Sequence, residues 1–258
     1  TENLRQRAPK LRWIQTTGAG VDHLLPLDWL PAGVTLTNNS GPHGPKCEDF
    51  CTMALLALSA RLPRLVDQQR RQTWEPVFTV PIAGKTCVVI GYGDLGQAAA
   101  RAAKKLGLTV IAVTRTGQGT GVIPVSRIDE VLPQADFVIV ATPLTPETRN
   151  LMNRSRLALL RPEAGLVNVA RAPIVDYAAL AEMLRAGRLA GAMLDVHDPE
   201  PLPADSELWS TPNLILTPHV SCDDPRYVDM LLDAWAANLR RLDANQGLKN
   251  VVDPARGY

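Results

Sequence analysis

Three side chains, Arg171, Glu200 and His219, have the residue types that proton and hydride transfer to a small anion would need. Arginine presents a rigid fork of donors that fits a carboxylate and an adjacent carbonyl. Histidine changes charge near neutral pH, so it can protonate a carbonyl oxygen as hydride reaches the carbon. A neighbouring glutamate would stabilise the protonated ring. These three residues are therefore the candidate catalytic set.

The stretch GYGDLG at 91–96 fits the pattern G-x-G-x-x-G, and it directly follows a predicted strand and opens a predicted helix. Its first glycine permits a tight turn, its second lets backbone approach a pyrophosphate, and its third lets the helix pack close to the sheet. The free N–H groups of the helix favour an anion. The sequence therefore predicts a dinucleotide site, the alternative being a tight turn without a ligand. The residues assigned to this site are Gly91, Gly93, Asp94, Leu95 and Gly96.

The end of the second predicted strand indicates which dinucleotide would bind. NAD-preferring sites usually carry an acid there, to accept a hydrogen bond from the ribose 2′-OH. This chain has Thr114, Arg115 and Thr116 instead. An arginine would pair with a 2′-phosphate, and the two hydroxyls could donate to it. NADP is therefore the predicted preference, with NAD possible, unless Arg115 is an ordinary surface arginine.

Six short apolar runs predict the strands of one parallel sheet that is covered on both faces. They are 86–90, 108–113, 137–141, 166–169, 191–195 and 213–216. Helical stretches at 97–106 and 176–187 alternate with them, and Asp176 is a predicted cap of the second. The alternation predicts a doubly wound α/β domain. Because ligands bind at the carboxyl ends of such strands, one sheet edge would carry the glycine turn and the catalytic candidates.

Both chain ends differ from this central block. The elements predicted there are strands at 11–16 and 34–38, one long helix at 46–70 and an amphipathic helix at about 225–245. A second, smaller domain built from both chain ends is therefore expected. The predicted division assigns 1–78 with 221–258 to this domain, and 79–220 to the dinucleotide-binding domain.

The composition limits the class of protein. Lys and Arg total 27 against 26 Asp and Glu, so no global charge favours nucleic acid or an anionic membrane as a partner. No apolar run approaches the roughly 20 residues of a membrane helix. The four cysteines form no CxxC pair and no metal-ligand spacing with histidine, which predicts packing roles for Cys47 and Cys51, a reducing cytoplasmic setting and no metal. The remaining histidines, His23, His43 and His197, are expected at turns or on the surface.

Taken together, these motifs resemble the D-isomer-specific 2-hydroxyacid dehydrogenases over nearly the whole chain. The stretches that carry the resemblance include TTGAGVDHL (16–24), ATPLTPETRNLM (141–152), VNVAR (167–171), LDVHDPEPLP (194–203) and TPHVS (217–221). The resemblance implies a Rossmann sheet, a flavodoxin-like smaller domain and a homodimer with the long helix near the interface. It also implies that Arg171, Glu200 and His219 are the catalytic arginine, glutamate and histidine.

The resemblance assigns further residues around the substrate and the cofactor. The backbone amides implied to hold the substrate carboxylate are those of Thr17, Gly18, Ala19 and Gly20. The cofactor residues implied are Thr142 and Pro143 at the nicotinamide ribose and Asp195 at the carboxamide. The TRT stretch at 114–116 is similar to the NADP-preferring branch of the family, which includes glyoxylate and hydroxypyruvate reductases.

The chain departs from the family pattern in three places. Members normally begin with additional βα units before the stretch that corresponds to LRWIQT, so about two such units, on the order of 50 residues, are expected to be missing here. Asp49 stands where a histidine is common. Ala172 stands where glycine often follows the catalytic arginine, a difference expected to matter little.

The resulting hypothesis is an NAD(P)H-dependent reductase of small 2-keto acids, of the glyoxylate or hydroxypyruvate type, that gives D-2-hydroxy acids. Three alternatives stay open: a phosphite dehydrogenase-like enzyme, a non-catalytic NAD(P)H-sensing binding protein, and an inactive shortened paralogue. A formate-oxidising enzyme is disfavoured, because the resemblance to that branch would predict Gln in place of Glu200.

Overall fold

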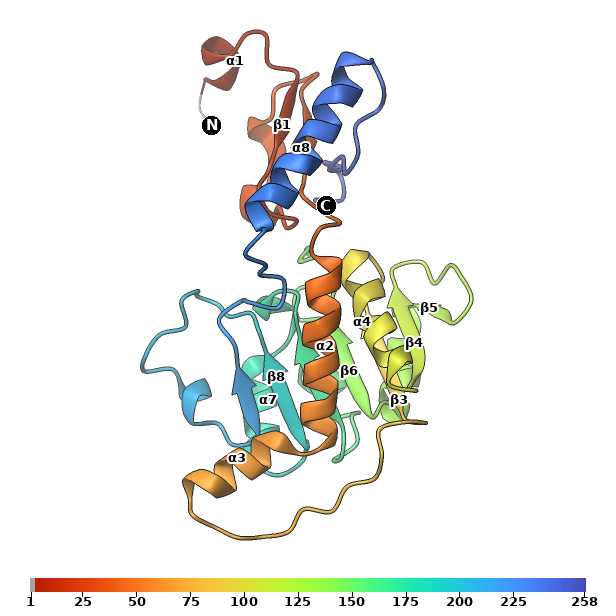
Figure 1. The fold of residues 1–258 in the computed structure, drawn as a ribbon, viewed down its shortest axis with the longest axis vertical. Helices are drawn as coiled ribbons and strands as arrows, with labels where there is room; N and C mark the ends of the chain where they lie inside the picture. Colours follow the sequence, from red (N-terminus) through yellow and green to blue (C-terminus); the bar gives the residue numbers. More distant parts are fainter. Residues whose placement is uncertain (1–2) are drawn as a thin grey trace. The chain divides into compact units, whose positions relative to one another are not determined.

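The computed structural model describes residues 3–258, which divide into two units (Figure 1). Gly44–Asp223 form the larger unit, and residues 3–43 with Asp224–Tyr258 form the smaller one. The predicted domains differ from these units mainly in residues 44–78, which belong with the large sheet. The predicted division concerns function, and as such it stays a prediction.

The larger unit is built on a seven-stranded parallel sheet with the strand order β5-β4-β3-β6-β7-β8-β9. The strands are β3 (Thr86–Ile90), β4 (Thr109–Thr114), β5 (Val122–Pro124), β6 (Phe137–Val140), β7 (Gly165–Asn168), β8 (Gly191–Leu194) and β9 (Leu214–Leu216). The predicted doubly wound sheet and its six strands are confirmed. The edge strand β5 was not predicted, because three residues ending in a proline carry no periodic signal and proline suits only an edge.

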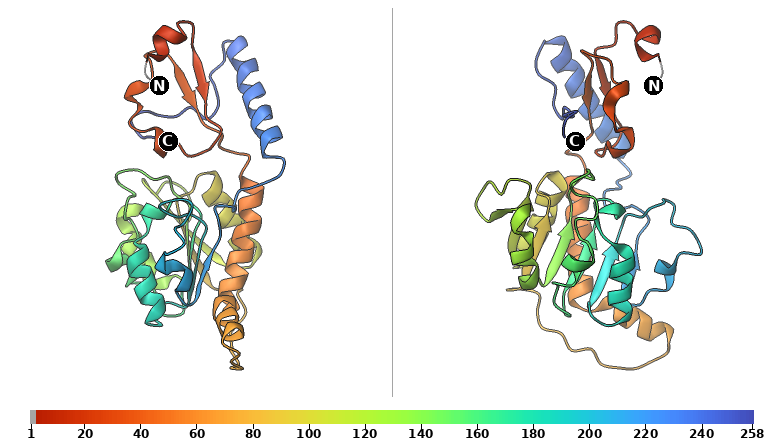
Figure 2. Two further views of the ribbon diagram at one scale, coloured as in Figure 1. Left: turned by 90° about the vertical axis from the view of Figure 1, so that its left-hand side faces the viewer. Right: turned by 180° about the vertical axis from the view of Figure 1, so that it is seen from behind.

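Helices cover both faces of this sheet. They are α2 (Gly44–Ser59), α3 (Leu62–Arg70), α4 (Asp94–Lys105), α5 (Ile128–Val131), α6 (Arg154–Leu157) and α7 (Tyr177–Arg185). Figure 2 shows α2 on one side of the sheet and α7 on the other. Alternate residues of β3 enter different cores: Cys87 and Val89 pack with α2 and α4, whereas Val88 and Ile90 pack with α5 to α7. This two-sided burial explains why the strands are continuous apolar runs.

The helical region at 46–70 is two helices, so the prediction of one long helix was wrong. The helical conformation is interrupted at Arg61, whose backbone is left-handed with φ 57°. Pro63 has no N–H to continue the bonds of α2, and its ring would clash with the carbonyl four residues earlier. Within the first turn of α3 the same proline is tolerated. The buried Cys47 and Cys51 of α2 have packing positions as predicted, with sulfur atoms 3.9 Å apart.

The smaller unit contains a parallel pair of strands, β1 (Trp13–Gln15) and β2 (Thr35–Thr37), and the helices α1 (Leu4–Arg7) and α8 (Tyr227–Asp243). Its small core contains Val21, Leu36 and Val252, and the ring of Trp13 stacks on that of Trp235 from α8 at 6.2 Å. Both chain ends therefore build one unit, as predicted. Over residues 3–258, every helix is too short or too polar to cross a membrane.

The packing of α4 against the turn that follows β3 can be tested at Gly96. A Cβ added to Gly96 would lie 2.0 Å from the carbonyl oxygen of Gly91, which is rigid backbone. We expect Gly96→Ala to lower the free energy of unfolding by about 1–3 kcal/mol, because overpacking forces the backbone to shift. The matched control is Gly93→Ala, whose Cβ would meet no atom within 4 Å, and which should change stability by less than about 0.5 kcal/mol. Equal urea midpoints for the two variants would contradict this account.

Candidate active site

The glycine turn joins β3 to α4 at the point where the strand order changes direction. Gly91 has φ 93°, and a Cβ there would lie 2.5 Å from Ala141 O and 2.7 Å from Thr142 Cα, so the turn is held against the segment that follows β6. Gly93 is exposed, with open space where a side chain would be. It is also the N-cap of α4, and no side chain caps the first turn of this helix, whose N–H groups lack partners within the helix. The turn therefore fits a dinucleotide pyrophosphate, as predicted from the pattern.

The residues predicted to choose between the two dinucleotides follow at the end of β4, the neighbour of β3. The Thr114 hydroxyl accepts a hydrogen bond from Gly117 N at 3.0 Å, which shapes the turn. Arg115 and Thr116 are exposed. Glu147, in the loop after β6, was not among the predicted site residues. The Thr145 hydroxyl, which donates to its carboxylate at 2.7 Å, and to a smaller extent the charge of Arg115 hold the pKa of Glu147 below its usual range. An acid therefore lies in the field of the arginine, although no sequence pattern indicates it.

A glutamate–histidine pair lies beyond the ends of β8 and β9. His219 Nδ1 is 2.9 Å from one carboxylate oxygen of Glu200, and His197 N donates to the other at 2.8 Å. Partial burial of Glu200 opposes ionisation, but these two hydrogen bonds hold its pKa below the usual range. With Glu200 ionised, Nδ1 is the donor of this pair, which leaves Nε2 of His219 for proton exchange with a substrate. The predicted pairing of the two residues is present.

Asp195 holds the turn that presents His219. This carboxylate is fully buried, and it accepts from Thr217 Oγ1 (2.6 Å), Val220 N (2.9 Å) and Ser221 N (2.8 Å). These donors lie on both sides of His219, whose φ of 56° is a strained value for a residue with a side chain. Asp195 is therefore an anchor of the histidine turn. Its contact with a nicotinamide carboxamide stays a prediction.

Arg171 follows β7, the strand between β6 and β8. Its side chain is half-buried, and Nη1 donates to Ala170 O at 2.8 Å. The order β6-β7-β8-β9 and the parallel direction of these strands bring the segments after them to one sheet edge. Thr142 and Pro143 follow β6 on this edge, beside the glycine turn. All the predicted catalytic and cofactor residues thus belong to the larger unit, on the carboxyl edge of its sheet.

The four predicted substrate residues lie in the smaller unit, in the loop between β1 and the short helix Asp22–Leu24. Two of their carbonyls are bonded: Tyr227 Oη donates to Thr17 O, and both Thr16 Oγ1 (2.8 Å) and Asn39 N (3.0 Å) donate to Gly18 O. Among residues 3–258, the N–H groups of Gly18, Ala19 and Gly20 have no protein acceptor. Clustered free N–H groups suit an anion. Their role toward a substrate carboxylate stays a prediction.

His43 lies in a turn, as expected, but the burial of His43 and the partial burial of His197 were not predicted. His197 is half-buried, and its Nε2 donates to Thr217 O at 2.9 Å. His43 is buried and stacks on Tyr227 at 5.4 Å. Sequence reasoning missed them because a lone histidine carries no signal of its packing partners.

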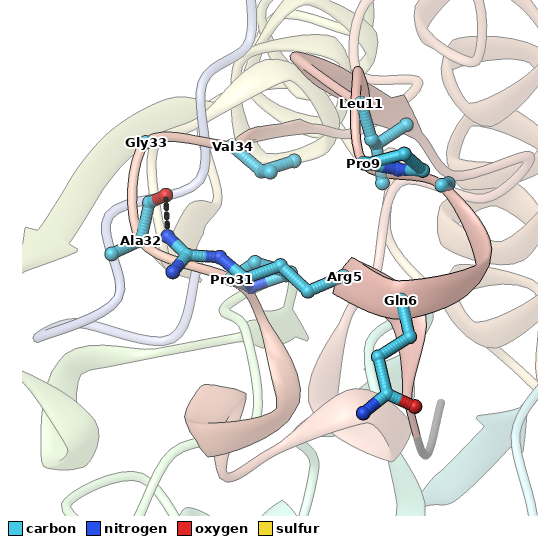
Figure 3. A pocket seen from close by; sticks show the side chains of 9 residues that line it. Arg5, Gln6, Pro9, Leu11, Pro31, Ala32, Gly33 and Val34 are labelled. Carbon is cyan, nitrogen blue, oxygen red and sulfur yellow. Dashed lines mark hydrogen bonds between the residues drawn. The ribbon is translucent and has the colours of Figure 1, made fainter.

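A shallow hollow in the smaller unit contains none of the predicted site residues (Figure 3). Arg5 and the turn around Gly33 line it, and Arg5 Nη2 donates to Ala32 O at 2.9 Å. No other charged residue lines the hollow. It offers no groups for catalysis.

The family profile described as "D-isomer specific 2-hydroxyacid dehydrogenase, NAD binding domain" matches residues 52–221. The chain belongs to this family. It is therefore an NAD(P)-dependent oxidoreductase, and the resemblance drawn from its motifs is confirmed.

Individual family members resemble this dehydrogenase chain over most of its length. It is 34% identical to a glyoxylate reductase of Thermococcus onnurineus (strain NA1) over 229 residues, which are 83% of this chain and 67% of that protein. A D-isomer-specific 2-hydroxyacid dehydrogenase of Xanthobacter autotrophicus Py2, solved with NADPH and MES, has a TM-score of 0.90 and 37% identity, covering 100% of this chain and 82% of the other. An NADPH-dependent glyoxylate/hydroxypyruvate reductase of Sinorhizobium meliloti, solved with NADP and sulfate, has a TM-score of 0.89 and 30% identity, covering 100% and 84%.

The pKa of Glu200 predicts how stability depends on pH. Because that pKa is lower in the folded chain than in an unfolded one, ionised Glu200 stabilises the fold above the unfolded value, and this contribution is lost as pH falls through the folded value. We expect Glu200→Gln to be less stable than wild type by a constant amount near neutral pH, and this difference to shrink in acid. Urea unfolding at a series of pH values measures it, with the exposed Glu163→Gln as control. A difference that is the same at every pH would contradict the prediction.

Proposed function

We propose that this chain reduces a small 2-keto acid of the glyoxylate or hydroxypyruvate type to a D-2-hydroxy acid, with NADPH as its preferred cofactor. The observation that carries the proposal is the pair formed by Glu200 and His219, 2.9 Å apart, on the sheet edge that also carries the glycine turn. Relatives named glyoxylate reductase support the substrate class, and structural neighbours solved with NADPH or NADP support the cofactor.

In the proposed reaction the substrate carbon gains a hydride and the carbonyl oxygen gains a proton. Gly91, Gly93 and Gly96 of the glycine turn would hold a nicotinamide cofactor, which would supply the hydride and balance the reduction by its own oxidation. The Arg171 guanidinium binds the substrate carboxylate and polarises the carbonyl. Nε2 of His219 donates the proton, while Nδ1 keeps its hydrogen bond to Glu200. Ionised Glu200 stabilises the protonated ring of His219 before the proton is transferred, so the histidine holds the proton that it must donate.

The free N–H groups at Gly18, Ala19 and Gly20 support the predicted role of this loop in binding a substrate carboxylate. Backbone donors recognise the carboxylate common to all 2-keto acids and leave the side chain of the substrate unread. In this proposal the smaller unit supplies substrate binding, and residues 79–220 supply cofactor binding.

A homodimer is part of the proposal. The stretch between α3 and β3 forms no helix or strand (Figure 1). On the larger unit this stretch exposes Trp74 (97%) and Phe78 (94%). Aromatic side chains so exposed favour a protein interface, and a second copy of this chain is the proposed occupant. A monomer mass by light scattering at micromolar concentration would overturn this.

A cytoplasmic setting is also proposed. All four cysteines are free thiols, and burial raises the pKa of Cys87 to about 12, so this thiol stays protonated and unreactive. Such thiols are typical of a reducing compartment. Recovery of the protein mainly outside the cytosolic fraction would count against it.

The decisive test follows the absorbance of NADPH with glyoxylate, hydroxypyruvate and pyruvate. Wild type should turn over at least one of them, and His219→Asn should lose about 10²–10⁴-fold in kcat with an unchanged Kd for NADPH, because asparagine cannot supply the proton. The control is His23→Asn, which alters an exposed histidine of the smaller unit. Unchanged kcat in His219→Asn would remove the acid assignment. NADPH binding without any turnover by wild type would favour a non-catalytic binding protein.

The cofactor preference has its own test. Arg115→Ala should raise the Kd for NADPH about 10–100-fold and leave the Kd for NADH nearly unchanged, because only the 2′-phosphate offers a charged partner to this side chain. Arg188→Ala, an exposed arginine just beyond the carboxyl end of α7, is the control for lost positive charge. Fluorescence titration measures both constants. Equal losses for the two cofactors would show that Arg115 does not read the phosphate.

A further inference from the structure

A buried amide at the end of β7 holds the turn that presents Arg171. Asn168 is fully buried, and both the oxygen and the nitrogen of its side-chain amide are hydrogen-bonded. Its Oδ1 accepts from Ala170 N at 3.0 Å, and its Nδ2 donates to Arg171 O at 3.1 Å and to Tyr177 Oη at 2.9 Å. Because only the nitrogen can donate, this network fixes the orientation of the amide.

The hydroxyl of Tyr177 continues the network to the next strand. It accepts from Asn168 and donates to Val196 O at 2.8 Å. Tyr177 is the first residue of α7, so the start of this helix is bonded to the end of β7 and to the segment that follows β8. Burial raises the pKa of this phenol, which keeps the proton needed for the bond to Val196.

Val196 directly precedes His197, whose backbone N–H is bonded to Glu200. The next residue, His197, donates its N–H to Glu200 Oε1 at 2.8 Å, and Glu200 Oε2 meets His219 at 2.9 Å. A continuous path of hydrogen bonds and one peptide unit therefore runs from the Arg171 carbonyl through Tyr177 to the Glu200–His219 pair.

We propose that Tyr177 is a positioning residue that couples the arginine turn after β7 to the Glu200–His219 pair after β8 and β9. The catalytic consequence rests on the proposed function. Without the hydroxyl, the buried Val196 carbonyl and one Asn168 N–H lose their partners, and a buried polar group without a partner is costly. Both segments would shift to regain hydrogen bonds, so Arg171 and Glu200 would no longer be held in register.

The test is Tyr177→Phe, which removes one oxygen atom and keeps the ring. We expect kcat for the keto acid to fall about 10–100-fold, because small displacements of catalytic groups have effects of this size, while the Kd for NADPH changes less than about twofold. The control is Tyr258→Phe, at the chain end in the smaller unit. In a Glu200→Gln background, the loss caused by Tyr177→Phe should be much smaller, because the coupled partner is already gone.

A readout independent of turnover is the amide resonance of His197 in ¹H–¹⁵N spectra. Its N–H donates to the Glu200 carboxylate, so its shift reports that bond and titrates with Glu200. In Tyr177→Phe we expect this amide proton to move upfield and its titration midpoint to rise toward the usual glutamate range. In a variant that is only less stable, the His197 amide shift and its titration midpoint should equal those of wild type at temperatures below its melting temperature.

The outcomes separate the two proposals. If wild type reduces no keto acid but the His197 amide changes in Tyr177→Phe, the proposed function fails and the coupling stands. If wild type is active and Tyr177→Phe changes neither kcat nor the His197 amide, the coupling is overturned. It is also overturned if kcat falls together with melting temperature while the His197 amide and its titration stay as in wild type.

Discussion

The buried carboxylate of Asp195 is the constraint on which the proposed catalytic edge depends. A charge without water must be compensated by donors, and the three donors that meet this carboxylate come from residues around His219. The cost of a left-handed backbone at His219 is offset by the same bonds. One buried acid therefore determines both where the histidine lies and how its ring is presented to Glu200. An apolar residue at 195 would accept none of these three hydrogen bonds and would leave this turn unsupported.

The sheet supplies the second requirement, which is that groups far apart in sequence meet on one edge. Its strands are parallel and their order reverses at β3, so the glycine turn lies at the centre of the sheet with β6 directly beside it. The catalytic candidates follow β7, β8 and β9 in succession. Helix packing on both faces makes this frame rigid, and the close approach of Gly91 and Gly96 shows how little space separates α4 from β3. Rigid elements of this kind can hold donors and acids at fixed distances while the loops vary.

Polar networks then adjust what the frame presents. Two hydrogen bonds hold the pKa of Glu200 below its usual range although this side chain is partly buried. The hydrogen bond from the Thr145 hydroxyl does most to lower the pKa of Glu147, and the charge of Arg115 contributes less. The two glutamates would affect different parts of the site. Glu200 contacts the proton-donating ring of His219, whereas Glu147 would act on the region expected to meet a 2′-phosphate.

Much of this protein could be predicted from the sequence because the relevant signals are local. Continuous apolar runs predicted six strands, and glycine spacing predicted the turn after β3. Residue types at the strand ends predicted that Arg171, Glu200 and His219 follow the strands on one sheet edge; their catalytic roles stay a prediction. The break between α2 and α3 was also encoded locally, in Pro63, but the apolar pattern on both sides of it concealed the signal. Tertiary structure alone decided the anchoring role of Asp195 and the bridge from Asn168 through Tyr177 to Val196. Each of these depends on contacts between residues on different strands or loops, and such pairings leave no periodic or compositional trace in a single chain.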